Sequence, residues 1–281
     1  MTGDEVMDRA RAAAKLGYGT VVLQAGEDPG LTESLVADLV RRIKAETPLA
    51  VTLSLGERTR EELAAWREAG ADRYLLKHET SDSELFRHIH PTPSERISLL
   101  KQARELGYET GSGVMVGIPG QTYESLADDI LLFRELDLDM VGCGPFIPHP
   151  DTPLGNSQYP IPDSRPQVPA TDVMTTKVVA LTRLACPDAN IPSTTALATV
   201  NRERGRELGL ERGANVWMPN LTPLEYRRLY DIYPGKAAVI DTAEQYHDNL
   251  LAVLAAFGRV PGEGPGGRGG HELSAENHRR A

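Results

Sequence analysis

Apolar residues recur along the chain in two alternating patterns, one typical of short buried strands and one typical of amphipathic helices. The helix pattern places apolar residues three or four positions apart, as in Val36, Leu39, Val40 and Ile43. The strand pattern occurs as short β-branched or apolar runs bounded by turn residues. The predicted strands are residues 19–23, 49–55, 73–77, 110–116, 139–142, 190–193 and 214–218.

Helical segments are predicted before the first strand and after every strand. Regular alternation of strands and helices predicts a parallel sheet with right-handed crossovers, and eight such units close a TIM barrel. The predicted helices are residues 4–16, 32–45, 59–69, 94–106, 123–136, 171–185, 200–208, 223–230 and 242–257.

Seven units behind an initial helix predict an α/β fold of the TIM-barrel type, with the first strand missing. A doubly wound open sheet is the alternative, but no Gly-x-Gly-x-x-Gly loop follows the first predicted strand. The barrel is expected to occupy residues 1–258. Residues 259–281 are expected to be a disordered tail, because this Gly- and Pro-rich segment has little apolar surface to bury.

The stretch from residue 108 to residue 122 is the most unusual part of the chain. It holds a short apolar strand between glycines, and it ends in a Gly-Ile-Pro-Gly loop before a helix that Thr122 is suited to cap. A strand that leads through glycines to a helix start is a common ligand-binding position in α/β proteins. A tight turn that needs its glycines only for geometry is equally compatible with this pattern.

Composition and charge exclude several classes of function. The 281-residue chain has a net charge of −10, which argues against a nucleic-acid surface. No apolar run approaches the roughly 20 residues that span a bilayer. Two cysteines, Cys143 and Cys186, give no disulfide framework and fit the reducing cytoplasm. They are also too few to hold an iron–sulfur cluster or a cysteine-rich zinc site.

Polar side chains and glycines are expected to converge at the carboxyl ends of the strands, where barrel proteins carry their chemistry. This set suits a polar, zwitterionic ligand. Glu79 could accept hydrogen bonds from hydroxyls or an amine, and Arg96 could bind a carboxylate through two nitrogens. The alternative is that Glu79 and Arg96 only pair with each other.

Two other kinds of chemistry are weaker readings of the sequence. His88 and His90, with His78 and His149, suggest a metal hydrolase, but solvated surface histidines are favoured because the pair lies away from any strand end. Cys143 could be a nucleophile, but no histidine accompanies it in a recognisable pattern, so a small buried thiol is favoured.

Four long blocks, in order, give the chain a specific resemblance that runs from Met1 to about residue 262. They are residues 73–80, 113–122, 137–154 and 213–236. In these blocks the chain resembles the HydE family, the radical S-adenosylmethionine (SAM) maturases of [FeFe]-hydrogenase, which are relatives of biotin synthase. Biotin synthase and methylornithine synthase are less similar in the same blocks.

The resemblance implies two neighbouring groups of binding residues. Residues 25–27 match the motif near the methionine end of SAM, Glu79 and Arg96 match positions that hold its ribose and carboxylate, and residues 113–120 match the segment beside its adenine. The implied SAM-binding residues are Gln24, Ala25, Gly26, Glu27, Ser54, Glu79, Arg96, Met115 and Gly117. The implied substrate-binding residues, forming an anion pocket, are Thr52, Lys77, Thr194 and Thr195. Lys77 stands where the family usually has arginine, which keeps the charge and loses the two-pronged geometry.

One departure from the family concerns the metal centre. The family's Cys-x-x-x-Cys-x-x-Cys loop, which ligates a [4Fe–4S] cluster, precedes the helix at which this chain begins, so no metal ligands are assigned here. A second, optional cluster is also unmatched, because residues 237–249 contain no cysteine. A truncated or mis-started product, with the loop encoded upstream of Met1, is the expectation, and a catalytically dead barrel is the alternative.

The function that the resemblance implies is a radical SAM enzyme of hydrogenase H-cluster assembly. It would generate a 5′-deoxyadenosyl radical that attacks a small sulfur-containing substrate inside the barrel, and no catalytic residue is assigned. The implied cofactors are SAM and the [4Fe–4S] cluster. A small-molecule substrate and other hydrogenase maturases are the expected partners, in the cytoplasm and without nucleic acid or membrane. The alternatives are an inactive SAM-binding barrel or fragment, and an enzyme like biotin synthase or methylornithine synthase.

Overall fold

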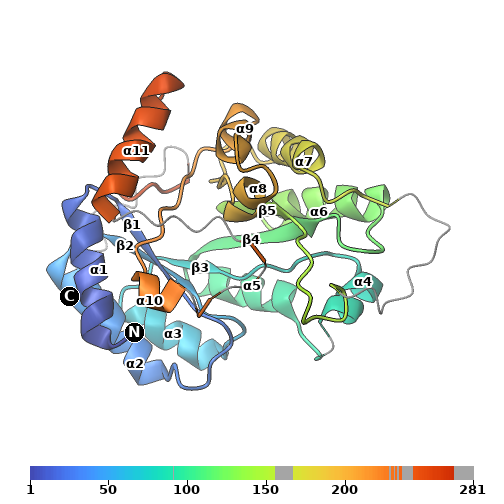
Figure 1. Ribbon diagram of the computed structural model, residues 1–281. Helices are drawn as coiled ribbons and strands as arrows, with labels where there is room; N and C mark the ends of the chain where they lie inside the picture. The colour runs from blue at the N-terminus through green and yellow to red at the C-terminus, as the bar shows by residue number, and fades with distance from the viewer. Residues whose placement is uncertain are drawn as a thin grey trace.

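Five parallel strands, hydrogen-bonded in chain order, form the sheet around which the structure is built (Figure 1). The computed structural model describes residues 1–90, 92–155, 167–227, 229–230, 232, 234–235 and 243–268. The strands are β1 (Thr20–Gln24), β2 (Ala50–Ser54), β3 (Arg73–Leu75), β4 (Glu109–Val116) and β5 (Met140–Pro145). The first five predicted strands and their parallel order are therefore confirmed.

The sixth and seventh predicted strands are reduced to single contacts. Asn190 forms an isolated parallel bridge with Met140, and Pro192 forms another with Val216. A ladder cannot extend through Pro192, because proline has no backbone N–H to donate. The described structure therefore contains a parallel sheet of five strands that two bridged segments continue.

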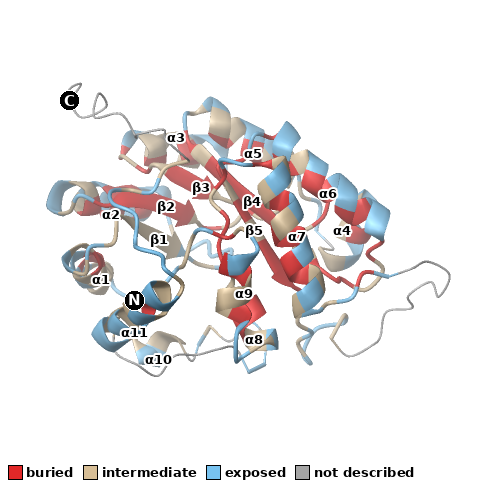
Figure 2. Cartoon of the chain, turned by 90° about the horizontal axis from the view of Figure 1, so that it is seen from above, coloured by how far each residue is buried: buried red, intermediate tan, exposed pale blue. Residues whose placement is uncertain are grey.

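Helices cover the outer face of the sheet, and Figure 2 shows α1, α2, α3, α5, α6 and α7 arranged around the buried strands. None of the helices within the described residues has the length and apolar character that a bilayer span needs. The helices are α1 (Gly3–Lys15), α2 (Glu33–Glu46), α3 (Arg60–Glu68), α4 (Ser83–Ile89), α5 (Arg96–Glu105), α6 (Tyr123–Glu135), α7 (Asp172–Ala185), α8 (Thr195–Val200), α9 (Gly205–Glu211), α10 (Leu224–Arg227) and α11 (Ala243–Ala256).

Three helical predictions need correction. Helix α4 was not predicted, although Asp82 caps it by accepting hydrogen bonds from two backbone N–H groups. Helix α5 begins at Arg96, two residues later than predicted, and the residue at its N-cap, Glu95, makes no capping hydrogen bond with its side chain. The helix expected at 200–208 is divided into α8 and α9, and Asn201 turns the chain between them by accepting a bond from the Arg204 N–H.

The strands present different side chains to their two faces. Their outward residues, such as Leu53, Tyr74 and Val114, pack with the helices in one apolar core. Gly111 of β4 and Gly142 and Gly144 of β5 line the inner side. Because side chains are absent there, open space remains inside the curved sheet.

Residues 259–268 have contacts that the sequence did not lead us to expect. The predicted disordered tail covers 259–281, of which 269–281 lie outside the described residues. Residues 259–268 lie against the amino ends of the strands, where the Pro265 carbonyl accepts hydrogen bonds from Thr20 and Arg73.

Candidate functional site

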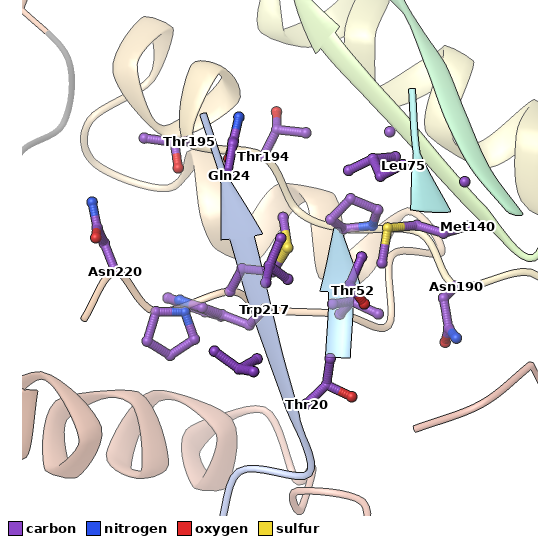
Figure 3. A pocket seen from close by; sticks show the side chains of 18 of the residues that line it. Thr20, Gln24, Thr52, Leu75, Met140, Asn190, Thr194, Thr195, Trp217 and Asn220 are labelled. Carbon is purple, nitrogen blue, oxygen red and sulfur yellow. The ribbon is translucent and has the colours of Figure 1, made fainter. Parts of the chain in front are cut away.

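A cavity of about 2110 Å³ occupies the inside of the curved sheet and reaches the carboxyl ends of the strands, called the mouth below. Figure 3 shows Gln24, Thr194 and Thr195 near one another at the carboxyl end of β1, with Thr20 at the opposite end of that strand. The cavity is large enough for a cofactor and a second small molecule, because typical ligand pockets measure about 300–1,000 Å³.

The structure brings most of the predicted binding residues to this cavity. All four residues of the expected anion pocket line it, as do Gln24, Ala25, Glu79 and Met115 of the expected cofactor group. The remaining five do not line it; they are Gly26, Glu27, Ser54, Arg96 and Gly117.

Glu79 is held at the mouth by its backbone. Its φ angle of 65° is uncommon for a residue with a side chain, and the neighbouring strand stabilises it. The Glu79 N–H donates to the Gly113 carbonyl (3.1 Å), and the Met115 N–H donates to the Glu79 carbonyl (3.3 Å). These two bonds place the Glu79 side chain beside the glycine-rich strand β4.

One carboxylate oxygen of Glu79 is available for a ligand. Oε2 is buried and receives no hydrogen bond from any described residue. Lys77 Nζ lies 3.1 Å away and forms an ion pair with it, but without hydrogen-bond geometry. A buried acceptor that lacks a donor is costly, so a hydroxyl or amine entering the cavity would gain a hydrogen bond here.

Arg96 pairs with Glu57 and not with Glu79, so the alternative of a mutual Glu79–Arg96 pair is wrong. Arg96 Nε donates to Glu57 Oε1 (2.9 Å), and Nη1 donates to the Lys77 carbonyl (2.9 Å). Burial raises the pKa of Glu57, but hydrogen bonds from Ser94 and Arg96 outweigh it and leave the pKa lowered. Arg96 thereby ties the end of β3 to the turn after β2.

The four histidines considered for a metal hydrolase do not converge on one another in the part of the chain that the structure describes. Among the described residues, one group of possible ligands converges, made of Glu27, Glu57 and His90, whose ligand atoms lie within 4.8 Å of one another. Arg96 already supplies positive charge to it, at 2.9 Å from Glu57 and 3.8 Å from Glu27. His78 is elsewhere, buried against Phe133 on the outer face of the sheet.

The loop after β4 is closed by a residue that the sequence reasoning did not single out. The wholly buried side chain of Gln121 accepts from the Gly117 N–H (2.7 Å) and donates to the Met115 carbonyl (3.1 Å). Gly117 has a φ of +84°, and a Cβ there would lie 2.4 Å from backbone atoms of Ala170. Gly117 therefore serves the turn, whereas Met115 faces the cavity.

Hydroxyl groups define the inner side of the cavity. Thr52 is buried and lines the cavity, and its Oγ1 has no hydrogen-bond partner among the described residues. Thr194 caps α8 through Oγ1, and Thr195 Oγ1 accepts a bond from Arg206 (3.1 Å). Arg206, which also lies over the ring of Trp217, was not predicted from sequence.

The buried groups behind the sheet are unsuited to catalysis in the cavity. Burial, and then the nearby charges of Lys77 and Arg96, lower the pKa of His78 to about 4. Burial raises the pKa of Cys143 to about 11, so the favoured reading of this residue as a buried thiol is confirmed.

Comparison of the sequence with known proteins identifies the family of this chain. The radical SAM superfamily model matches residues 1–133. The chain is 48% identical to the [FeFe] hydrogenase maturase subunit HydE of Thermotoga maritima, over 95% of this chain and 74% of that protein. It is 27% identical to 3-methylornithine synthase of Methanosarcina acetivorans, over 82% of this chain and 64% of that protein.

Solved structures show the same fold. Methylornithine synthase (PylB) superimposes with a TM-score of 0.75 at 24% identity, over 94% of this chain and 74% of that chain. HydG, a maturase of the [FeFe]-hydrogenase, superimposes with a TM-score of 0.67 at 19% identity, over 93% of this chain and 57% of that chain. With 48% identity over most of both sequences, the chain belongs to the HydE family of radical SAM proteins.

Proposed function

We propose that this chain is the binding barrel of a radical SAM enzyme of [FeFe]-hydrogenase assembly. It would hold SAM at the mouth of the cavity and a small sulfur-containing substrate deeper inside. The observation that carries the proposal is the buried Oε2 of Glu79, which is ion-paired with Lys77 but receives no hydrogen bond from a described residue, at the edge of a cavity with room for two ligands.

The residues at the mouth fit SAM. Glu79 Oε2 would accept a hydrogen bond from a ribose hydroxyl, because a carboxylate offers only acceptors and a hydroxyl can donate. The adenine would lie beside residues 113–120, where the side chain of Met115 faces the cavity. Gln24, Ala25, Gly26, Glu27 and Ser54, at the ends of β1 and β2, would surround the methionine end.

Arg96 would bind the carboxylate of SAM through Nη2. Its other contacts use Nε and Nη1, whereas Nη2 lies 3.8 Å from Glu27, beyond hydrogen-bond distance. The side chain of Glu27 is 54% exposed and could move aside when a carboxylate arrives.

The substrate pocket would select a small anionic group. Lys77 supplies a positive charge inside the cavity, and Thr52 supplies a buried hydroxyl without a partner. Thr194 and Thr195 border the same cavity from the start of α8. These groups would hold the substrate beside the ribose end of SAM, because Lys77 and Glu79 are in direct contact.

The chemistry that SAM supplies in this family is a 5′-deoxyadenosyl radical, which would attack the substrate. The cluster of the family does not fit the cysteines of this chain. Cys143 lies on β5 and Cys186 follows α7, both buried, and together they cannot supply three thiolates at the mouth. We therefore assign this chain the binding and orientation of SAM and substrate, and we derive no step through the cluster.

We extend the same proposal to the fold and the setting. Residues 190–193 and 214–218 would be the sixth and seventh positions of a TIM-type barrel, because each continues the sheet through a parallel bridge. Other hydrogenase maturases would be the partners of the protein in the cytoplasm.

Activity with the cluster loop supplied tests the proposed function. The family's Cys-x-x-x-Cys-x-x-Cys loop would be joined ahead of residue 1, the protein reconstituted anaerobically with iron and sulfide, and release of 5′-deoxyadenosine from SAM measured. We expect release, and an apparent SAM affinity about 10–100-fold lower in Glu79→Gln, since a hydrogen bond to a charged group contributes about 1.5–3 kcal/mol.

Glu84→Gln is the matched control, because Glu84 is exposed on α4. Binding of SAM without release of 5′-deoxyadenosine would favour the inactive binding barrel. Equal SAM affinities of the Glu79→Gln and Glu84→Gln variants would reject the assigned site.

A further inference from the structure

Residues 259–268, called the strap below, cross the amino ends of the strands. The Pro265 carbonyl accepts hydrogen bonds from Thr20 Oγ1 (2.7 Å) and Arg73 Nη2 (3.0 Å), and the Gly266 carbonyl accepts one from Asn190 Nδ2 (3.0 Å). These donors come from β1, from β3 and from the segment bridged to β5. The strap thus spans the sheet from its first strand to its last neighbour.

The strap also forms one wall of the cavity. Every residue from 258 to 266 lines the same cavity that reaches the carboxyl ends of the strands. Figure 3 shows Thr20 at the end of β1 opposite Gln24, and Asn190 away from Thr194 and Thr195. The cavity therefore runs along the inner face of the sheet between the two ends of the strands, and the strap lies across its amino end.

The chain leaves room for the strap at Gly19. A Cβ on Gly19 would lie 1.7 Å from the Gly264 carbonyl oxygen and 2.5 Å from its carbon. The φ of Gly19 lies outside the left-handed region, so its backbone could accept another residue. The close approach of the strap is what requires glycine here.

Polar contacts, rather than apolar burial, hold the strap in place. Val260 is 85% exposed, and no residue of the strap is buried. Arg268 anchors one end through Asp137 (2.5 Å), and Arg259 anchors the other by donating to the Leu210 carbonyl (2.8 Å). Segments with few buried apolar contacts open at low cost relative to the core.

The surface beneath the strap is hydrophilic. Arg73 is only 6% exposed and forms an ion pair with Glu109, and both residues line the cavity. Thr20 and Asn190 complete the rim. Displacement of the strap would expose a polar ring that small polar or charged molecules can cross.

We propose that the strap is a removable floor of the barrel cavity and that its displacement opens a second, polar entrance at the amino ends of the strands. This inference does not depend on which ligand occupies the mouth. It gives residues 259–268 the role of a gate.

Thiol labelling from the floor tests the gate. Met140 lines the cavity at the start of β5, and the native Cys143 and Cys186 are buried, so Met140→Cys provides the reporter. The rate of its reaction with an anionic aromatic disulfide reagent would be measured in the full chain with and without Gly19→Ala. We expect labelling at least tenfold faster with Gly19→Ala, because the added Cβ displaces the strap.

Gly3→Ala is the control, because the φ of Gly3 lies outside the left-handed region and a Cβ there would make only ordinary contacts of 3.4 Å with the side chains of Leu39 and Arg42. We expect its labelling rate to stay within twofold of the rate of the full chain that carries Met140→Cys alone. Two shortened chains provide a second test. One ends after Gly258 and lacks the strap, and the other ends after Arg268 and keeps it.

The terminated pair keeps the proposal testable if Gly19→Ala does not fold. Labelling of the chain ending at Gly258 should be at least tenfold faster than that of the chain ending at Arg268. Equal labelling rates in these two chains would overturn the proposed gate. So would a full chain carrying only Met140→Cys that already reacts as fast as an exposed thiol.

Discussion

Lys77 Nζ lies 3.1 Å from Oε2 of Glu79, and this ion pair joins the two halves of the cavity mouth. Both residues follow the last residue of β3, Leu75, and both line the cavity, while His78 between them packs against Phe133 on the outer face. The residue proposed to hold SAM is thus in contact with the residue proposed to hold the substrate.

The first prediction concerns the charge in this pair. Lys77→Met would leave the Glu79 carboxylate partly buried without a counter-charge, and we expect the free energy of unfolding at pH 7 to fall by about 1 kcal/mol. The expected loss is small because the Lys77 side chain is 34% exposed, so water screens its interaction with Glu79. Urea denaturation measures it, with Lys77→Arg as the control that keeps the charge. Identical midpoints for the two variants would show that the pair contributes nothing to stability.

The second prediction concerns the turn after β4. Gly117→Ala would place a Cβ 2.4 Å from backbone atoms of Ala170 at a φ of +84°, and we expect a loss of about 2–4 kcal/mol in unfolding free energy. Gly142→Ala is the control, because its Cβ would meet the Ser112 carbonyl oxygen at an ordinary 3.8 Å. Chemical denaturation of both variants measures the difference. A Gly117→Ala protein as stable as Gly142→Ala would mean that the turn can relax.

The third prediction concerns the pH dependence of stability. Burial raises the pKa of Asp129 to about 6 from its ordinary 3.8, even though Ser81 donates to its Oδ1 (2.5 Å). The folded state therefore binds a proton more tightly than the unfolded state, so Asp129 lowers stability as the pH rises from about 4 to 6. We expect Asp129→Asn to remove this loss and to stabilise the protein by about 1–3 kcal/mol at pH 7.

Asn at position 129 would keep an oxygen that can accept the Ser81 hydrogen bond. Unfolding free energies at pH 4, 5, 6 and 7 measure the effect, with Asp128→Asn as the control, because Asp128 is exposed on the same helix. A pH profile of Asp129→Asn that matches wild type would contradict the assigned ionisation.

Local patterns predicted the parts of the fold that have a clear period. The five strands and the helices α1, α2, α3, α6 and α7 were found because apolar residues repeat along them. Helix α4 was missed because it is only seven residues long, with one fully buried side chain, Leu85. The two last strands were overpredicted, since Pro192 interrupts the ladder and a hydropathy pattern carries no hydrogen-bond information.

The resemblance grouped residues that the fold brings to one cavity, and their binding roles stay predictions. Thr52, Lys77, Thr194 and Thr195 come from three distant parts of the chain and line one cavity, as the resemblance implied. The pairing of Arg96 with Glu57 could not be predicted, because Glu57 comes from a turn 39 residues earlier in the chain. The contacts of the strap could not be predicted from the sequence either, because many of them use backbone carbonyls, which every residue has.

The position of the bound cofactor is the central claim, and a crystal structure of the protein with SAM tests it most directly. We expect a ribose hydroxyl within hydrogen-bond distance of Glu79 Oε2 and the adenine against residues 113–120. SAM bound elsewhere, or bound with Glu79 Oε2 still lacking a donor, would contradict the assigned site.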